Sequence, residues 1–193
     1  EAVKAILPAH CREAWQKHQG GTGHAVRCAL ETMEDGCSNV LVLYGDMPLV
    51  RPETIQRLVE VHVCTGSVIS MTTIVVDDFG SWRTSLADYG RVLRDPRGDI
   101  IGVREVRDAS PDELLVREVN PSHFCFSAEW LREALPRLTP ANAQGEYYLT
   151  DLVALACGEE RKITTILCDA SEGLGVNTPE QLAVAEQLAT SRG

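Results

Sequence analysis

One apolar stretch stops abruptly at a carboxylate and limits how the whole chain can fold. Residues 39–49 read Asn-Val-Leu-Val-Leu-Tyr-Gly-Asp-Met-Pro-Leu, with four successive apolar residues at positions 40–43. Such a run without alternation is typical of a strand covered on both faces. Ligands of α/β sheets bind beyond the carboxyl ends of the strands, which is where Asp46 falls. The alternative is that Asp46 only caps a turn before a helix that begins near Pro52.

Charge and cysteine usage exclude several classes of protein. The 193 residues include 18 Lys plus Arg and 28 Asp plus Glu, which gives a net charge of −10. We therefore expect no nonspecific binding to nucleic acid. Seven cysteines stand singly with no pair at metal-ligand spacing, which predicts reduced thiols in a cytoplasmic protein. Because the sequence has no long apolar run and no signal-peptide pattern, we expect no membrane association.

A glycine-rich loop leads into an amphipathic helix near the start. Residues 19–24 read Gln-Gly-Gly-Thr-Gly-His, and apolar residues follow at helical spacing. Such a junction exposes backbone N–H groups and lets a ligand approach closely. The alternative is a tight turn with Thr22 as the N-cap and no ligand. The loop is neither a Walker loop nor a dinucleotide fingerprint, because both spacings are missing.

The remaining pattern predicts one α/β domain over residues 1–193. A helix at 52–64 and a strand at 67–76 follow the first apolar stretch, an alternation that indicates a parallel crossover. Loop 77–88 is long and polar. The other expected elements are a hairpin at 89–92 and 100–104 around a turn at 96–99, strands at 114–119, 124–126 and 163–167, and helices at 128–135, 152–157 and 180–189.

Several polar residues arrive at the ends of apolar runs. Glu105 and Asn120 either bind a ligand or are simply exposed polar groups at strand ends. His123 is expected to be a packed or surface histidine rather than a catalyst, because no nucleophile pattern surrounds it. Asn177 precedes a helix start that Thr178 and Pro179 already explain, so its own role needs another reason.

Taken together, five motifs resemble those of the N-acetylglucosamine-1-phosphate uridyltransferases. These are the amino-terminal domains of a bifunctional bacterial enzyme, within the sugar-nucleotide pyrophosphorylases. The resemblance spans about residues 16–188, and its most specific part is Ala-Gln-Gly-Glu-Tyr-Tyr-x-Thr-Asp at 143–151. The other motifs are Gln-x-Gly-Thr-Gly-His-Ala from Gln19, Tyr-Gly-Asp-x-Pro-Leu from Tyr44, Tyr-Gly-Arg from Tyr89, and Gly-Val-Asn from Gly175.

The resemblance implies a fold and a reaction. The fold is a Rossmann-like, glycosyltransferase-A-like nucleotidyltransferase, with a mixed, mostly parallel sheet and helices on both faces. The reaction is Mg²⁺-dependent transfer of UMP from UTP to N-acetylglucosamine 1-phosphate, which yields UDP-N-acetylglucosamine for cell-wall synthesis, and pyrophosphate. The partners are these two small molecules, with no nucleic acid and no membrane, and a full-length protein of this type can form homo-oligomers.

The resemblance also assigns roles to individual residues. Asp46 and Asn177 match the catalytic pair that binds Mg²⁺. The nucleotide side is matched by Gln16, Gln19, Gly21, Thr22 and Tyr44, with the first four at the uracil ring and Tyr44 at the phosphates. The sugar phosphate side is matched by Gly90, Glu105, Asn120 and Thr150.

The chain departs from the family in three places. The family opens with a strand, a glycine-rich loop bearing an arginine, and a lysine that together hold the triphosphate, and Glu1 aligns past that unit. We therefore expect a chain that begins inside a larger protein, lacks one strand of its sheet and catalyses poorly by itself. Pro121 and Ser122 replace the usual Thr-Gly after Asn120, and loop 77–88 is longer than usual.

Two alternatives to this activity stay open. One is a noncatalytic module that binds a nucleotide sugar. The other is a nucleotidyltransferase that uses another nucleotide or acceptor, such as a cytidylyl or molybdopterin-guanylyl transferase, although the run at 143–151 weighs against it.

Overall fold

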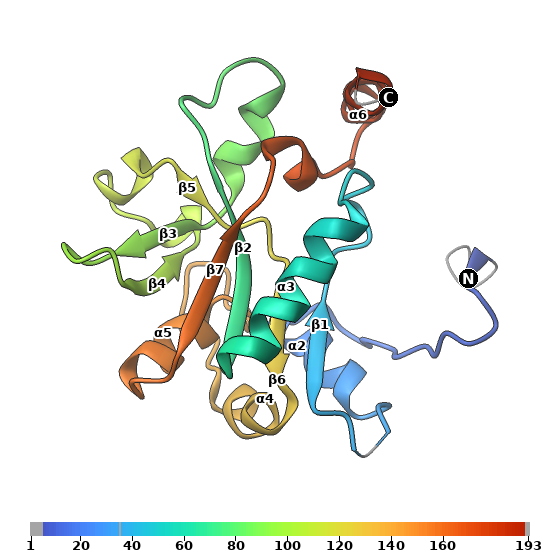
Figure 1. Ribbon diagram of the computed structural model, residues 1–193, viewed down its shortest axis with the longest axis vertical. Helices are drawn as coiled ribbons and strands as arrows, with labels where there is room; N and C mark the ends of the chain where they lie inside the picture. The colour runs from blue at the N-terminus through green and yellow to red at the C-terminus, as the bar shows by residue number, and fades with distance from the viewer. Residues whose placement is uncertain (1–5, 35, 192–193) are drawn as a thin grey trace.

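The computed structural model describes residues 6–34 and 36–191 and builds one sheet within them (Figure 1). The strands run in the spatial order β1-β6-β2-β5-β3-β4, and β7 pairs with β2 beside this path. Their bounds are β1 (Asn39–Val42), β2 (Ile69–Val75), β3 (Arg91–Arg94), β4 (Ile100–Arg104), β5 (Glu118–Val119), β6 (Phe124–Ser127) and β7 (Ile163–Leu167).

The directions of the strands correct the predicted sheet. Strand β6 lies antiparallel between β1 and β2, so these two run the same way without being neighbours. The parallel pairing is β2 with β7, and the other pairings of the described strands are antiparallel. A mostly parallel sheet was therefore the wrong expectation. Antiparallel neighbours can be joined by short loops, as β3 and β4 are, whereas adjacent parallel strands need a long crossover.

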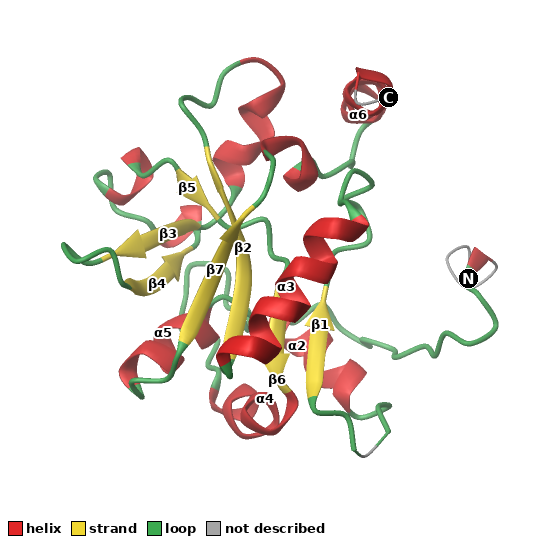
Figure 2. Ribbon diagram, in the orientation of Figure 1, coloured by secondary structure: helices red, strands yellow, loops and turns green. Residues whose placement is uncertain are grey.

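Helices cover both faces of the sheet, as predicted (Figure 2). Side chains of β6 show the division: Phe124 and Phe126 join the main core with α2, α4 and α5, while Cys125 packs with Leu58 of α3 and Ile166 on the other face. The helices are α2 (Thr22–Leu30), α3 (Pro52–Thr65), α4 (Ala128–Ala134), α5 (Asp151–Gly158) and α6 (Pro179–Ser191). Short 3₁₀ turns are η1 (Ser81–Asp88), η2 (Val106–Asp108), η3 (Glu113–Leu115), η4 (Leu135–Arg137) and η5 (Ala170–Gly173).

The first strand is less covered than its apolar run predicted. Leu41 is 38% exposed and Leu43 is 41% exposed, and a hollow of about 350 Å³ separates this stretch from α2. Strand β2 does have both faces buried along residues 69–74. The expectation of full coverage was thus wrong for β1, because β1 has β6 on one side and the hollow along α2 beside it.

Most local predictions agree with the structure. The hairpin of β3 and β4 forms, and Thr178 caps α6 by accepting a hydrogen bond from the Gln181 N–H at 3.2 Å. The polar loop 77–88 forms η1 and buries Leu86 completely. The predicted strand at 114–119 was mostly wrong, because Leu114 and Leu115 face outward in η3 and only Glu118–Val119 pairs. Over the described ranges, no helix has the length and apolar content needed to cross a membrane.

Candidate active site

Asp46 and Asn177 meet although they lie 131 residues apart. Asp46 follows β1, and Asn177 lies between η5 and α6. The Asn177 side-chain N–H donates to Asp46 Oδ2 at 3.4 Å, and the Val176 N–H donates to the backbone oxygen of Asp46 at 2.8 Å. A side chain at Gly175 would lie 3.5 Å from Asp46 Oδ2 and 3.2 Å from the Tyr89 hydroxyl, so its glycine keeps this corner open.

The chemistry of this pair suits Mg²⁺. The ion binds oxygen and usually keeps water and substrate phosphates as ligands, with one or two oxygens from protein. Asp46 offers a half-buried carboxylate. The Asn177 carboxamide currently turns its nitrogen toward Asp46, and half a turn of the amide would present its oxygen instead. Among the described residues, no group of three or more His, Cys, Asp or Glu could hold a metal ion.

A cavity of about 220 Å³ contains five of the predicted site residues. Thr22, Tyr44, Gly90, Glu105 and Asn120 line it, from both the glycine-loop side and the hairpin side. Burial raises the pKa of the Tyr44 hydroxyl, which lies near Asp46. The structure thus brings the predicted nucleotide and sugar sides onto one cavity.

The hairpin wall of this cavity is held in place by hydrogen bonds. Glu105 accepts a bond from the Thr150 hydroxyl at 2.7 Å, and burial raises the pKa of its carboxyl. The buried Asn120 carboxamide accepts from the Ser122 N–H and points its nitrogen at Met71 Sδ, 3.6 Å away. Gly90 leaves no room for a side chain, since a Cβ would lie 2.8 Å from Val103 Cγ1. Thr150 therefore acts on the cavity through Glu105.

The glycine loop serves contacts within the chain. Gly21 has a φ of +91°, and a Cβ there would lie 2.8 Å from the backbone oxygen of Tyr147. The same oxygen accepts the Gly23 N–H at 2.7 Å, and the Leu149 N–H donates to Thr22 Oγ1 at 2.9 Å. Thr22 begins α2 and Gly21 is the N-cap, so a Thr22 cap was the wrong alternative. The loop therefore packs against the segment 146–149. This contact brings the glycine-loop motif and the motif at 143–151 together.

The predicted base-binding residues divide into two groups. The Gln16 side chain reaches back and donates to the backbone oxygen of Gly21 at 3.1 Å, so Gln16, Gly21 and Thr22 form one patch. Gln19 is exposed on the same loop, and neither glutamine lines the cavity. Of the residues predicted to bind the base, Thr22 therefore reaches the cavity, while Gln16, Gln19 and Gly21 lie beside it.

Tyr89 is a site residue that the sequence analysis did not single out. Its hydroxyl donates to the Gly173 backbone oxygen at 2.6 Å, and burial, with Asp46 nearby, raises its pKa to about 12. It belongs to the Tyr-Gly-Arg motif, which was the available signal. Further cavity residues that were missed are Met47, Asp88, Ser122, Gln144, Glu146 and Tyr148. Of these, only Gln144, Glu146 and Tyr148 stood in a specific motif.

The cavity carries acids without a compensating cation. Asp88, Glu105 and Glu146 line it, and its lining includes no Arg or Lys. Phosphate groups in such a place need a positive charge from outside this lining. His123 cannot supply it: the side chain is fully buried against Thr72 Oγ1 at 3.1 Å, and burial lowers its pKa to about 4. The prediction that His123 is a packed histidine is confirmed.

Comparison with solved structures shows the same fold in enzymes that handle nucleotides. A CMP:2-keto-3-deoxy-manno-octonic acid synthetase complexed with CTP matches 93% of this chain and 72% of its own, with a TM-score of 0.64 at 17% identity. A UDP-glucose pyrophosphorylase complexed with UDP-glucose matches 92% of this chain and 65% of its own, with a TM-score of 0.66 at 13% identity. At these identities the likeness shows the nucleotidyltransferase fold.

Comparison of sequences reaches further. The chain is 40% identical over 183 residues to the bifunctional protein GlmU of Trichlorobacter lovleyi, which covers 94% of this chain and 38% of that protein. It is 38% identical to GlmU of Desulfitobacterium hafniense. That match covers the whole of this chain and 41% of the relative. The chain thus spans about two fifths of the curated relatives it matches, and the resemblance drawn from the motifs is confirmed. Residues 4–154 match the family model of the MobA-like NTP transferase domain, and the chain belongs to this family.

Proposed function

We propose that the protein containing this chain transfers UMP from UTP to N-acetylglucosamine 1-phosphate. The observation that carries the proposal is the meeting of Asp46 and Asn177 close to Tyr44 and Tyr89, at the cavity lined by Gly90, Glu105 and Asn120. The similarity to GlmU over the whole chain supports it. In the reaction a phosphate oxygen of the sugar phosphate bonds to the α-phosphorus of UTP, the bond to the β-phosphate breaks, and pyrophosphate leaves.

The residues would act by positioning rather than by nucleophilic attack. Glu105, held by Thr150, and the buried Asn120 would orient the sugar through its hydroxyl and amide groups. The backbone of Gly90 would approach the sugar phosphate, and Gln16 with Gly21 and Thr22 would bind the base. Exposed Gln19 would have to turn inward to take part.

Asp46 and Asn177 would hold the metal. Bound Mg²⁺ would supply charge neutralisation at the α-phosphate and the leaving phosphates. This need is strong here, because the cavity lining is acidic and contains no Arg or Lys. For the same reason we expect this cavity to hold phosphate groups weakly by itself, so that an efficient reaction needs cationic groups from outside its lining. Such an enzyme would work in the cytoplasm on two small molecules, without nucleic acid or membrane.

The test is pyrophosphate release by the natural full-length protein with UTP, N-acetylglucosamine 1-phosphate and Mg²⁺. Asp46→Asn keeps the size of the side chain and removes its charge, so we expect at least a hundredfold loss of kcat/KM. Asp99→Asn is the matched control: this carboxylate lies on the hairpin turn, is 76% exposed, and should leave the rate unchanged.

Three results would contradict the proposal in different ways. Turnover with another nucleotide or sugar phosphate, but not with this pair, would overturn the substrates. Binding of UDP-N-acetylglucosamine without any turnover would favour a noncatalytic module. Full activity of Asp46→Asn at saturating substrate would remove Asp46 from the mechanism.

A further inference from the structure

A chain of three side chains, Cys28, His24 and Gln16, lies behind the predicted base-binding patch. The Gln16 side-chain nitrogen is 3.0 Å from His24 Nδ1 and 3.1 Å from the backbone oxygen of Gly21. On the other side of the ring, His24 Nε2 is 3.6 Å from Cys28 Sγ. His24 is buried at 7% exposure, while Gln16 is half-buried at the surface.

The donors and acceptors in this chain can be assigned from chemistry. A backbone oxygen only accepts, so the group of Gln16 that faces Gly21 must be the N–H₂ end. Its second N–H points at His24 Nδ1, which must then be unprotonated and accept. The ring proton therefore sits on Nε2, where it faces the Cys28 sulfur.

The histidine ring is fixed by its surroundings. It stacks on His18 with ring centres 5.0 Å apart. It also lies directly against Gly20, where a Cβ would come within 2.8 Å of Nδ1. A ring held from these sides keeps Nδ1 directed at Gln16.

We propose that His24 is a positioning residue that sets the orientation of the Gln16 carboxamide and thereby selects the nucleotide base. With both N–H groups of Gln16 engaged, its Oε1 is the polar atom left for a ligand, and it can only accept. The uracil ring of UTP has one N–H, at N3, whereas cytosine carries a lone pair at that position. An acceptor that meets the base at N3 thus favours UTP over CTP. The inference rests on the proposed function, whose base site it specifies.

The test compares two His24 variants of the full-length protein. In His24→Asn the side-chain oxygen can replace Nδ1 as acceptor, whereas His24→Leu has a similar volume and no acceptor. We expect His24→Leu to reduce the ratio of kcat/KM for UTP over CTP about tenfold, mainly by raising KM for UTP. His24→Asn should keep the ratio within about threefold of wild type.

The outcomes separate this inference from the proposed function. If His24→Leu lowers kcat/KM equally for UTP and CTP, the role of His24 is purely structural and the inference is overturned. Equal kcat/KM for both nucleotides in the wild type would also overturn it. Wild-type turnover of UTP with a different sugar phosphate would overturn the proposed acceptor and leave the inference standing. If His24→Leu does not fold, nitrogen NMR of the wild-type imidazole decides: a proton on Nε2 with Nδ1 accepting supports the inference, and a proton on Nδ1 overturns it.

Discussion

Glu160 shows how a single residue can hold backbone strain at a helix end. It follows α5 with a φ of +53°, a left-handed conformation that costs a side-chain-bearing residue about 1 kcal/mol. Its N–H donates to the Cys157 oxygen and the Arg161 N–H to the Ala156 oxygen, the pattern in which glycine is usual. We expect Glu160→Gly to raise the free energy of unfolding by about 0.5–1 kcal/mol in urea titrations, whereas Glu160→Ala should not. An equal gain from alanine would contradict the role of the φ angle.

His123 makes a second prediction at this scale. Burial lowers its pKa to about 4 from an ordinary value of 6.5. The unfolded chain then binds the proton at a higher pH than the folded chain, so stability falls as the pH drops from about 6.5 to 4. Between pH 7 and 5 this amounts to about 2 kcal/mol. Burial also lowers the pKa of His62, which adds to the loss in the same direction. Urea titrations of His123→Gln should show a clearly smaller loss than wild type; an identical loss would contradict the prediction.

Some site residues could be predicted from the sequence, whereas the roles or conformations of others could not. Position in the sequence drew attention to Asp46 beyond an apolar run and to Asn177 before a helix start that other residues explain, and the family resemblance then paired them as Mg²⁺ ligands. The glycines were recognised, but their purpose was not, since Gly21 and Gly23 are needed where Tyr147 approaches from 124 to 126 positions away. Ser122 has a φ of +64° in the segment that lines the cavity. The serine itself does not signal this conformation, although the glycine that the family usually has at this position does.

Secondary structure at the level of elements followed from local pattern, and pairing did not. The helical stripe of α3, the turn of the β3–β4 hairpin and the cap of α6 all depend on residues close in sequence. The insertion of β6 between β1 and β2 depends on contacts about 50 and 85 residues away in sequence. An apolar run gives the same signal in a parallel or an antiparallel sheet when helices cover both faces. For that reason the sheet direction could not be predicted.

A buried carboxylate joins the two segments that carry the metal pair. Glu172 of η5 has a fully buried side chain and pairs with Arg51 at the start of α3, through Arg51 Nε and Nη2 at 3.1 and 3.0 Å. It also accepts the Arg51 backbone N–H at 3.0 Å. Asp46 lies five residues before Arg51, and Asn177 lies five residues after Glu172. The carboxylate thus ties together the loops on which Asp46 and Asn177 sit.

We expect Glu172→Gln to weaken this connection. The amide nitrogen of glutamine cannot accept and the charge is removed, so at least one of the Arg51 donors loses its partner, at a cost of about 1 kcal/mol in the free energy of unfolding. Hydrogen bonds from the Thr54 side chain, from Arg51 and from the Asp169 backbone together outweigh burial and lower the pKa of Glu172, so its stabilisation is present above pH 4.5 and is lost as the pH falls. The variant should therefore lose less stability than wild type below pH 4.5. Surface-exposed Glu129→Gln on α4 is the control and should change stability by less than about 0.5 kcal/mol; an equal effect would contradict the role of Glu172.

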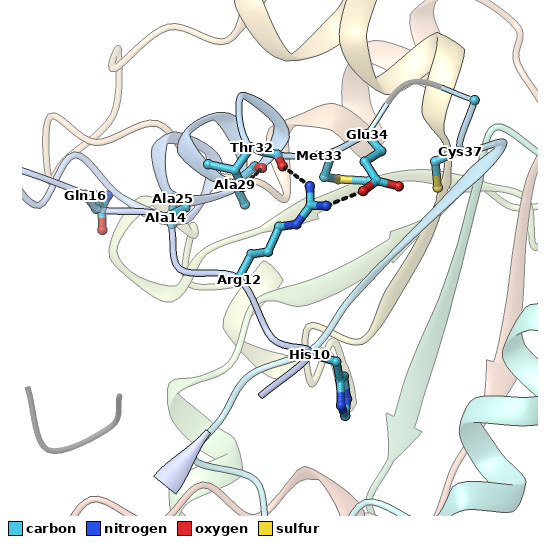
Figure 3. A pocket seen from close by; sticks show the side chains of 11 residues that line it. His10, Arg12, Ala14, Gln16, Ala25, Ala29, Thr32, Met33, Glu34 and Cys37 are labelled. Atoms are coloured by element: carbon cyan, nitrogen blue, oxygen red, sulfur yellow. Dashed lines mark hydrogen bonds and ion pairs between the residues drawn. The ribbon is translucent and has the colours of Figure 1, made fainter. Parts of the chain in front are cut away.

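At the scale of the whole molecule, one side of the sheet is poorly filled. The apolar hollow between β1 and α2 adjoins a second, open one of about 980 Å³, bordered by residues 10–16, α2 and residues 32–34, 36 and 37 (Figure 3). Arg12 reaches across it to Thr32 and Glu34. These contacts are exposed and contribute little stability. Leu41 and Leu43 therefore stay partly in water beside an edge of β1 that pairs with no other strand of the described residues.

The chain spans about two fifths of its curated relatives, and we expect a longer protein that contains it to cover this side by adding a strand to the free edge of β1. An unpaired edge beside apolar side chains is unfavourable in a stable domain, and pairing would satisfy its N–H groups. Hydrogen exchange tests this: the β1 amides that β6 does not pair should exchange at least tenfold more slowly in the full-length protein than in residues 1–193. Amides of β2, which has pairing partners on both sides, are the internal control for changes in overall stability. Equal exchange of β1 in both proteins, with β2 unchanged, would mean that no strand is added at this edge.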